Sequence, residues 1–295
     1  MKKDDVRALA GLPVILLIAG LLAWAGSQGG VTVLGLPLFT LSIMLAFIIQ
    51  WIVFIPAFLL QTEKFYDLTG SLAYLTVSIS AVRLSESPDA RAWLLLALVV
   101  IWAARLGSFL FTRVLKSGKD SRFDEIKPSL PRFLLAWTLQ GLWISFTLAA
   151  ALAAITSRLR VPLDFFAGLG LLVWIVGFSI EALADWQKNR FRADPANQDR
   201  FIRSGLWSWS RHPNYFGEIT LWTGVAIIAL PVLRGWQFLT LISPVFIFIL
   251  LTRISGIPML EQRADKKWGG LPEYEQYKAN TSVLVPLPPR KGRNK

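Results

Sequence analysis

Long apolar runs are the feature that most constrains this chain. A helix of about 17 to 25 apolar residues matches the thickness of a bilayer core. Eight such runs occur among the 295 residues, at roughly 8–26, 38–60, 68–84, 92–112, 133–155, 163–186, 215–233 and 236–252. The third run is the weakest because it is rich in serine and threonine. The sequence therefore predicts an all-α, polytopic integral membrane helix bundle with seven to eight transmembrane helices.

The basic residues predict the orientation of these helices. The net charge is +12, yet no basic stretch is interleaved with aromatic residues on a soluble domain, so we expect no nucleic acid partner. The positive-inside rule explains the charge better. With a cytoplasmic N-terminus and eight spans, about 25 of the 31 Lys and Arg residues fall on the cytoplasmic side. We therefore expect a cytoplasmic C-terminus and contacts with membrane lipid.

The composition also excludes several kinds of site. The chain has no cysteine, which excludes disulfides, thiolate nucleophiles and cysteine metal ligands. It has one histidine, so a histidine metal cluster is implausible and we expect no metal. The sequence shows no convincing internal repeat and no low-complexity linker, so we expect residues 1–295 to form a single domain.

Ionisable residues lie within the end of the sixth apolar run and just beyond it. Side chains of this kind at membrane depth are costly and usually face a cavity or a partner. They are Glu181, Asp185, Asn189 and Arg192. Their spacing of four, four and three residues places them on one side of a helix. A helix end that merely leaves the membrane is the alternative interpretation. We favour a polar site, because two carboxylates one turn apart repel each other unless a group donates to them.

The stretch SRHPNYFGE, residues 210–218, precedes the seventh run and holds the only histidine. Pro213 suits the first turn of a helix. The free backbone N–H groups of such a turn, together with nearby arginine side chains, form a site that attracts anions. Arginines suit phosphates, whereas carboxylates and Asn suit hydroxyl groups and a carboxamide. A nucleotide cofactor has all of these groups. The sequence lacks a Gly-x-Gly-x-x-Gly turn after a strand, so helices would have to hold such a nucleotide. The residues gathered at this end are Arg200, Arg203, Arg211, His212, Asn214, Tyr215 and Glu218.

These motifs resemble a known family. RFIRSGLWSWSRHPNYFGEITLW, with Trp268, Tyr274, Tyr277 and a closing LVPLPP, is similar to the C-terminal half of steroid 5α-reductases. EKFYDLTGSLAYL and RLGSFLFTRVLKSGKDSRF are typical of its bacterial branch, called DUF1295. The resemblance divides the single domain into N-terminal helices, 1–60, and a catalytic region, 61–295. It implies an oxidoreductase of the bacterial inner membrane that uses NADPH to saturate a C=C bond conjugated to a ketone, in a lipophilic, steroid-like substrate entering from the bilayer.

The resemblance also implies roles for single residues. Asp67 lies near the position of the family's catalytic acid, a glutamate in steroid reductases, and the position of its phenol holds Trp102. Tyr66 and Tyr74 are the nearest phenols in sequence, and we assign catalysis to Asp67 and Tyr66. Glu181 replaces a family asparagine. The residues at cofactor-contacting positions are Asp185, Arg192, Arg200, Asn214, Glu218 and Arg253.

Two of these predictions have structural alternatives. Asp67 precedes a helix, where an aspartate also serves as a cap. Arg105, inside the fourth run, needs a partner and would neutralise the acidic residues of the sixth run or contact the cofactor.

Another enzyme class shares part of the pattern. Membrane methyltransferases of the isoprenylcysteine and phospholipid type, which use S-adenosylmethionine, also carry Arg-His-Pro-x-Tyr-x-Gly, followed by a Glu-Glu pair. Here Gln262 follows Glu261 in place of the second acid, which favours the reductase. A transporter or scaffold would leave the arginines around residue 210 without a purpose.

Overall fold

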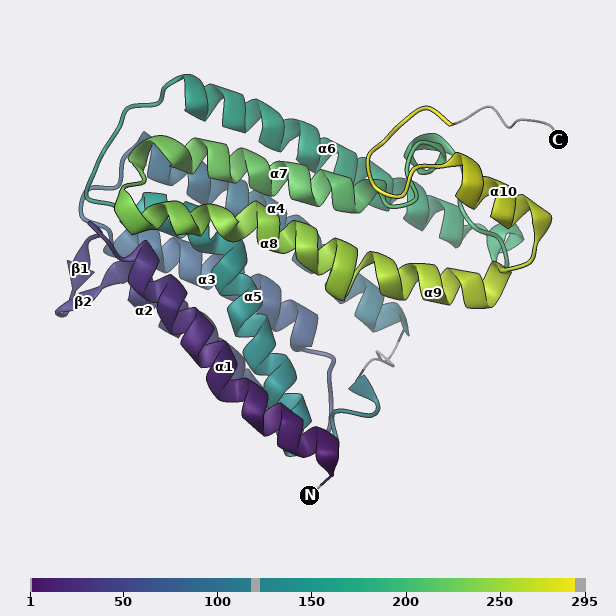
Figure 1. Ribbon diagram of the computed structural model, residues 1–295, viewed down its shortest axis with the longest axis horizontal. Coiled ribbons are helices and arrows are strands. Elements are labelled where there is room, and N and C mark those ends of the chain that lie inside the picture. Colours follow the sequence, from purple (N-terminus) through teal and green to yellow (C-terminus); the bar gives the residue numbers. More distant parts are fainter. Residues whose placement is uncertain (1, 118–122, 290–295) are drawn as a thin grey trace. The chain divides into compact units, whose positions relative to one another are not determined.

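The computed structural model describes residues 2–117 and 123–289, most of which are helical (Figure 1). The chain packs as two compact units. The first comprises Met1–Gly168 and Val225–Ser243, and the second comprises Leu169–Gly224 and Pro244–Lys295. Each unit is described by itself below.

The first unit is arranged around α5. Its elements are α1 (Lys3–Gly26), the antiparallel pair β1 (Thr32–Val33) and β2 (Leu36–Pro37), α2 (Leu38–Leu59), α3 (Tyr66–Leu84), α4 (Ala90–Ser117), α5 (Leu130–Thr156), and the 3₁₀ turns η4 (Leu230–Val232) and η5 (Gly235–Leu241). Helix α5 packs against each of the other four long helices. Its alanine-rich stretch, 149–154, is buried, and such small side chains allow neighbouring helices to approach closely.

The first unit contains a buried cation. Arg91, in the first turn of α4, is only 1% exposed. Its guanidinium donates to the carbonyl oxygens of Ile228 at 2.5 Å and Pro162 at 2.8 Å, and to Asp164 Oδ1 at 3.0 Å. Because every one of these acceptors is in place, the buried charge is tolerated.

The second unit contains the polar stretch 187–212 and the C-terminal segment. Its elements are α6 (Phe165–Ala193), η2 (Pro195–Asn197), η3 (Gly205–Ser208), α7 (Pro213–Ala229), α8 (Ile242–Ile249), the π-helical turn η6 (Leu250–Ile254), α9 (Ile257–Trp268) and α10 (Pro272–Asn280). Helix α7 begins at Pro213, which confirms the prediction from the proline. A few terminal residues of α6, α7 and α8 belong to the first unit.

Glycines bring α6 and α7 together. A Cβ added to Gly217 would lie 2.6 Å from both Gly177 O and Glu181 N. A Cβ added to Gly224 would lie 2.6 Å from Gly170 O. The two helices run side by side in Figure 1, at a separation that only glycine permits at these positions.

Seven helices in the described part of the chain are long and apolar enough to cross a membrane. They are Lys3–Gly26, Leu38–Leu59, Ala90–Ser108, Leu130–Thr156, Phe165–Ala193, Pro213–Val232 and Gly235–Trp268. The predicted all-α membrane bundle of seven to eight spans is thereby confirmed. The third of the eight runs needs correction: residues 66–84 do form α3, but their serine, threonine and charged residues leave this helix outside the seven.

Candidate functional site

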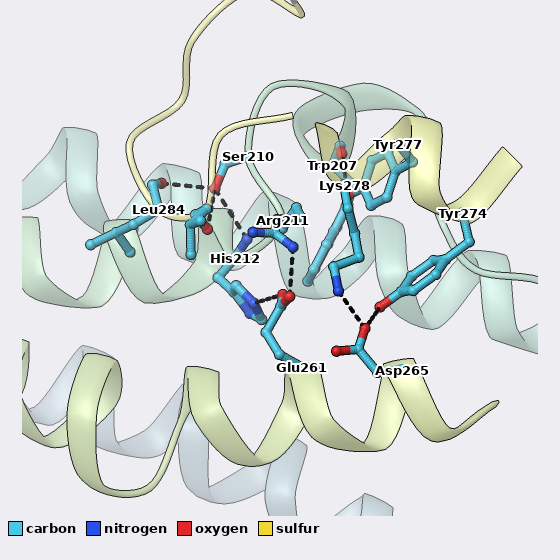
Figure 2. Close-up of polar contacts among 11 residues, drawn as sticks. Trp207, Ser210, Arg211, His212, Glu261, Asp265, Tyr274, Tyr277, Lys278 and Leu284 are labelled. Atoms are coloured by element: carbon cyan, nitrogen blue, oxygen red, sulfur yellow. Dashed lines mark hydrogen bonds and ion pairs between the residues drawn. The ribbon is translucent and has the colours of Figure 1, made fainter. Parts of the chain in front are cut away.

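The C-terminal segment fixes the chain just before α7. Ser210 forms a parallel bridge with Ser282, and Arg211 N donates to Ser282 O at 2.8 Å. Ser210 Oγ donates to Leu284 O at 2.7 Å and accepts from His212 N at 3.1 Å (Figure 2). These bonds hold Arg211 and His212 in place at the start of the helix.

Glu261, on α9, joins the two side chains. Its Oε2 accepts a hydrogen bond from Arg211 Nη1 at 2.5 Å, and its Oε1 lies 2.8 Å from His212 Nε2 (Figure 2). His212 is only 5% exposed, and its ring stacks on Tyr215 with 5.7 Å between centroids. One carboxylate therefore organises an arginine and a histidine that lie about fifty residues earlier in the chain.

A cavity of about 310 Å³ adjoins this group. Cations dominate its charged lining, with Glu261 as the one carboxylate among the described residues that line it. The cationic residues are Lys188, Arg192, Arg200, Arg211, Arg263 and Lys267. A concave site with this excess of positive charge suits a ligand with several negative charges.

Aromatic rings form another part of the lining. The Phe201 ring packs against those of Tyr274, Tyr277 and Trp268, with centroids 5.2, 5.4 and 5.8 Å apart. Tyr277 donates its hydroxyl hydrogen to Trp207 O at 2.7 Å. The cavity thus offers flat apolar surfaces beside its cations, as a ligand with both phosphates and rings requires.

Burial determines which protonation states the site holds. It lowers the pKa of His212, and the charges of Lys188 and Arg211 lower it further, although Glu261 opposes the shift. The imidazole is therefore neutral at neutral pH. Burial also raises the pKa of Tyr277, and burial together with the hydrogen bond to Asp265 raises that of Tyr274, so both phenols stay protonated.

Four of the residues predicted from the sequence line the cavity: Arg192, Arg200, Arg211 and His212. Arg203 does not line it and instead forms an exposed ion pair with Glu273 at 3.2 Å. Eight other predicted cofactor residues also lie outside the lining: Arg105, Glu181, Asp185, Asn189, Asn214, Tyr215, Glu218 and Arg253. Of these, Arg105 belongs to the first unit and the others to the second.

Some residues of this second set lie where α6 meets α7, whereas Arg253 is exposed. Asn214 Nδ2 donates to Asp185 Oδ1 at 3.3 Å, which links α7 to α6. Glu181 is 3% exposed and lies where α6 meets Gly217. Arg253 falls within the π-helical turn η6, an irregularity that is often found at functional sites.

Tyr66 and Asp67, the predicted catalytic residues, belong to the first unit. The Tyr66 hydroxyl donates to Ala136 O at 3.0 Å. Asp67 is half-buried in the first turn of α3, whose N-cap is Phe65, so the alternative interpretation of Asp67 as the cap of this helix was wrong. Tyr74 meets Trp102 edge-on at 5.0 Å, which places a phenol against the tryptophan at the family's phenol position.

Several lining residues were not among the predicted site residues: Lys188, Trp207, Glu261, Arg263, Lys267, Trp268, Tyr274 and Tyr277. Helical periodicity was the signal for α9, since its lining residues recur with the spacing of one helix face. In the sequence, Glu261 stands out only through the Glu-Glu position of the membrane methyltransferases.

A family model described as "Protein of unknown function (DUF1295)" matches residues 53–281, most of the chain. The chain belongs to the DUF1295 family. The match begins before α3 and ends after α10, so it includes the whole cavity lining of this DUF1295 protein.

One curated relative of the DUF1295 chain is named "Probable 7-dehydrocholesterol reductase", from Acanthamoeba polyphaga mimivirus. The two are 29% identical over 157 residues, which cover 46% of this chain and 33% of the relative. The chain thus matches about a third of that protein's length, and the name is consistent with the resemblance to steroid reductases. No solved structure matches.

Proposed function

We propose that this DUF1295 protein is an NADPH-dependent membrane reductase that saturates the C=C bond of a lipophilic enone. The observation that carries the proposal is the cavity beside Glu261, which combines six cations with aromatic rings. The reductase name of the mimivirus relative and the resemblance to steroid reductases support it. Seven long apolar helices suit a substrate that enters from the bilayer.

The residues of the cavity fit a phosphate-bearing nucleotide. Guanidinium and ammonium groups pair with phosphate oxygens, and arginine does so through two parallel hydrogen bonds. The buried Nδ1 of His212 and Nε of Arg211 have no hydrogen-bond partner among the described residues, and both belong to residues that line the cavity. About 310 Å³ is near the lower limit for ligand pockets, so the cavity would hold only part of a dinucleotide.

We assign the roles as follows. Arg192, Arg200 and Arg211 would hold the phosphates, and the rings around Phe201 would hold a planar group. NADPH supplies a hydride when bound. The matching proton would come from the chain, and Asp67 is the acid that we propose for it, with Tyr66 beside it.

The charge of the cavity distinguishes the two enzyme classes. S-adenosylmethionine carries a sulfonium cation and no phosphate. The six lining cations would repel the sulfonium group. NADPH carries several negative charges, which the same cations attract. The methyltransferase is therefore not favoured.

The test compares two arginines on α6. Arg192 lines the cavity, whereas Arg190 lies outside its lining with its guanidinium 5.4 Å from the Trp186 ring. Loss of a charge-assisted hydrogen bond costs about 1.5–3 kcal/mol, which corresponds to a roughly 10- to 150-fold weaker Kd. We expect Arg192→Gln to weaken NADPH binding by this factor and Arg190→Gln to leave it within about threefold, as measured by nicotinamide fluorescence. Saturable S-adenosylmethionine binding without NADPH binding would overturn the proposal.

A further inference from the structure

His212 holds a fixed position in the cavity wall. It is the chain's only histidine, 5% exposed, with Nε2 at 2.8 Å from Glu261 Oε1. The other oxygen of Glu261 accepts from Arg211 Nη1. A carboxylate can only accept hydrogen bonds, so Nε2 must carry the proton. In a neutral imidazole this leaves Nδ1 as an acceptor.

That acceptor is buried and unmatched. Nδ1 is shielded from solvent and has no hydrogen-bond partner among the described residues. Buried polar atoms are normally paired, and an unmatched one is often explained by an absent ligand or water. Because His212 lines the cavity, a ligand there is the candidate partner.

The preceding residue gives a contrast. Arg211 Nε is also buried and has no partner among the described residues, but it is a donor. A phosphate oxygen would satisfy Arg211 Nε. An unprotonated phosphate oxygen cannot satisfy His212 Nδ1, because neither atom has a hydrogen to donate. The two neighbouring residues therefore require different chemical groups.

We propose that His212 Nδ1 accepts a hydrogen bond from a neutral N–H or O–H group of the bound nucleotide, such as a ribose hydroxyl or an amide. Glu261 is the positioning residue that holds the imidazole in the tautomer required for this contact. The inference rests on the proposed function, because it takes NADPH as the ligand of the cavity. It adds that this part of the cavity recognises a hydrogen-bond donor, while the arginines recognise phosphates.

A single histidine makes the proposal directly measurable. Full-length protein labelled with ¹⁵N-histidine in detergent micelles gives one Nδ1 signal and one Nε2 signal by NMR. Without ligand we expect Nε2 to be protonated and Nδ1 to be unprotonated. On addition of NADPH we expect the Nδ1 signal to shift as a hydrogen-bond acceptor does, while Nε2 stays protonated. Nicotinamide fluorescence of the same sample reports whether NADPH has bound.

The outcomes separate the two proposals. NADPH that binds without moving the Nδ1 signal would overturn this inference and leave the proposed function standing. A histidine protonated at Nδ1 in the free protein would overturn it as well. If NADPH does not bind at all, the proposed function fails and the ligand part of the inference fails with it, whereas the spectrum of the free protein still decides the tautomer.

Variants test the role of Glu261. The amide of Glu261→Gln can donate to Nε2, so we expect the free variant to populate the Nδ1-protonated tautomer. The matched control is Glu273→Gln, which removes an exposed carboxylate paired with Arg203 outside the cavity lining. We expect that control to keep the parent tautomer. An unchanged tautomer in a folded Glu261→Gln variant would show that Glu261 does not position His212.

Discussion

Gly217→Ala tests how closely α6 and α7 must approach to hold the start of α7 in place. The added Cβ would lie 2.6 Å from Gly177 O and from Glu181 N. Ordinary van der Waals contacts of a Cβ atom begin at about 3.4 Å, so the new methyl group would be about 0.8 Å too close. Both neighbours are backbone atoms that cannot rotate away, so the helices would have to separate.

The expected magnitude follows from two opposing effects. Overpacking of a tight contact costs about 1–3 kcal/mol. Replacing glycine by alanine within a helix gains about 0.8–1.0 kcal/mol. Because the clash involves backbone on both sides, we expect a net destabilisation of about 1–2 kcal/mol. Gly168→Ala is the matched control on α6, since an added Cβ there meets nothing within 4 Å.

Thermal unfolding of the purified protein in detergent measures the difference. We expect a lower midpoint for Gly217→Ala and an unchanged or higher one for Gly168→Ala. NADPH affinity should also fall in Gly217→Ala, because α7 carries the Asn214–Asp185 hydrogen bond and begins directly after Arg211 and His212. Equal midpoints for the two variants would refute the close approach of the helices.

Three further predictions concern chemistry and topology. Burial lowers the pKa of His212, so NMR titration of the free protein should place this pKa below 6.5. A hydrogen-bond donor to Nδ1 stabilises the neutral ring, so NADPH should lower the pKa of His212 further. A rise of this pKa with NADPH would indicate a phosphate beside the ring. Asp67→Asn should keep the NADPH affinity but lower the rate of enone reduction by roughly 10²- to 10⁴-fold, whereas turnover at the parent rate would remove Asp67 as the acid. A reporter fused after Lys295 should be active in the cytoplasm, and activity only outside would overturn the predicted orientation.

Apolar run length was sufficient to predict most helices, because a membrane helix satisfies its own backbone hydrogen bonds. Local proline chemistry was sufficient for the start of α7 at Pro213. Helix α3 differs from the other predicted helices in its serine and threonine side chains, which bond to backbone carbonyls four residues earlier, such as Thr69 Oγ1 to Phe65 O. Helix formation there was predicted correctly, but the inference from helix to membrane span was not supported.

The candidate site was only partly predictable, because its parts converge from distant segments. On α6, steps of four led to Asn189, but each step of four advances about 40° beyond a full turn, so the direction drifts. Seven residues complete nearly two turns, which places Lys188 closer to the line from Glu181, and Lys188, unlike Asn189, lines the cavity. The pairing of Arg211 with Glu261 joins residues fifty positions apart, and no local pattern reveals such a contact.

The positive-inside rule explains the sign of the charges near the ends of the apolar runs, but it does not explain why six of them converge. Arg190 obeys the same rule and rests on an aromatic face outside the cavity lining. Cations that share one cavity repel one another, and Glu261 is the one carboxylate among its described lining residues. If these six cations were dispersed over the protein surface, their mutual repulsion would be smaller, and the positive-inside rule would be satisfied equally well. The convergence is therefore unfavourable without a counter-charge, and a ligand with several negative charges, as we propose, would relieve it.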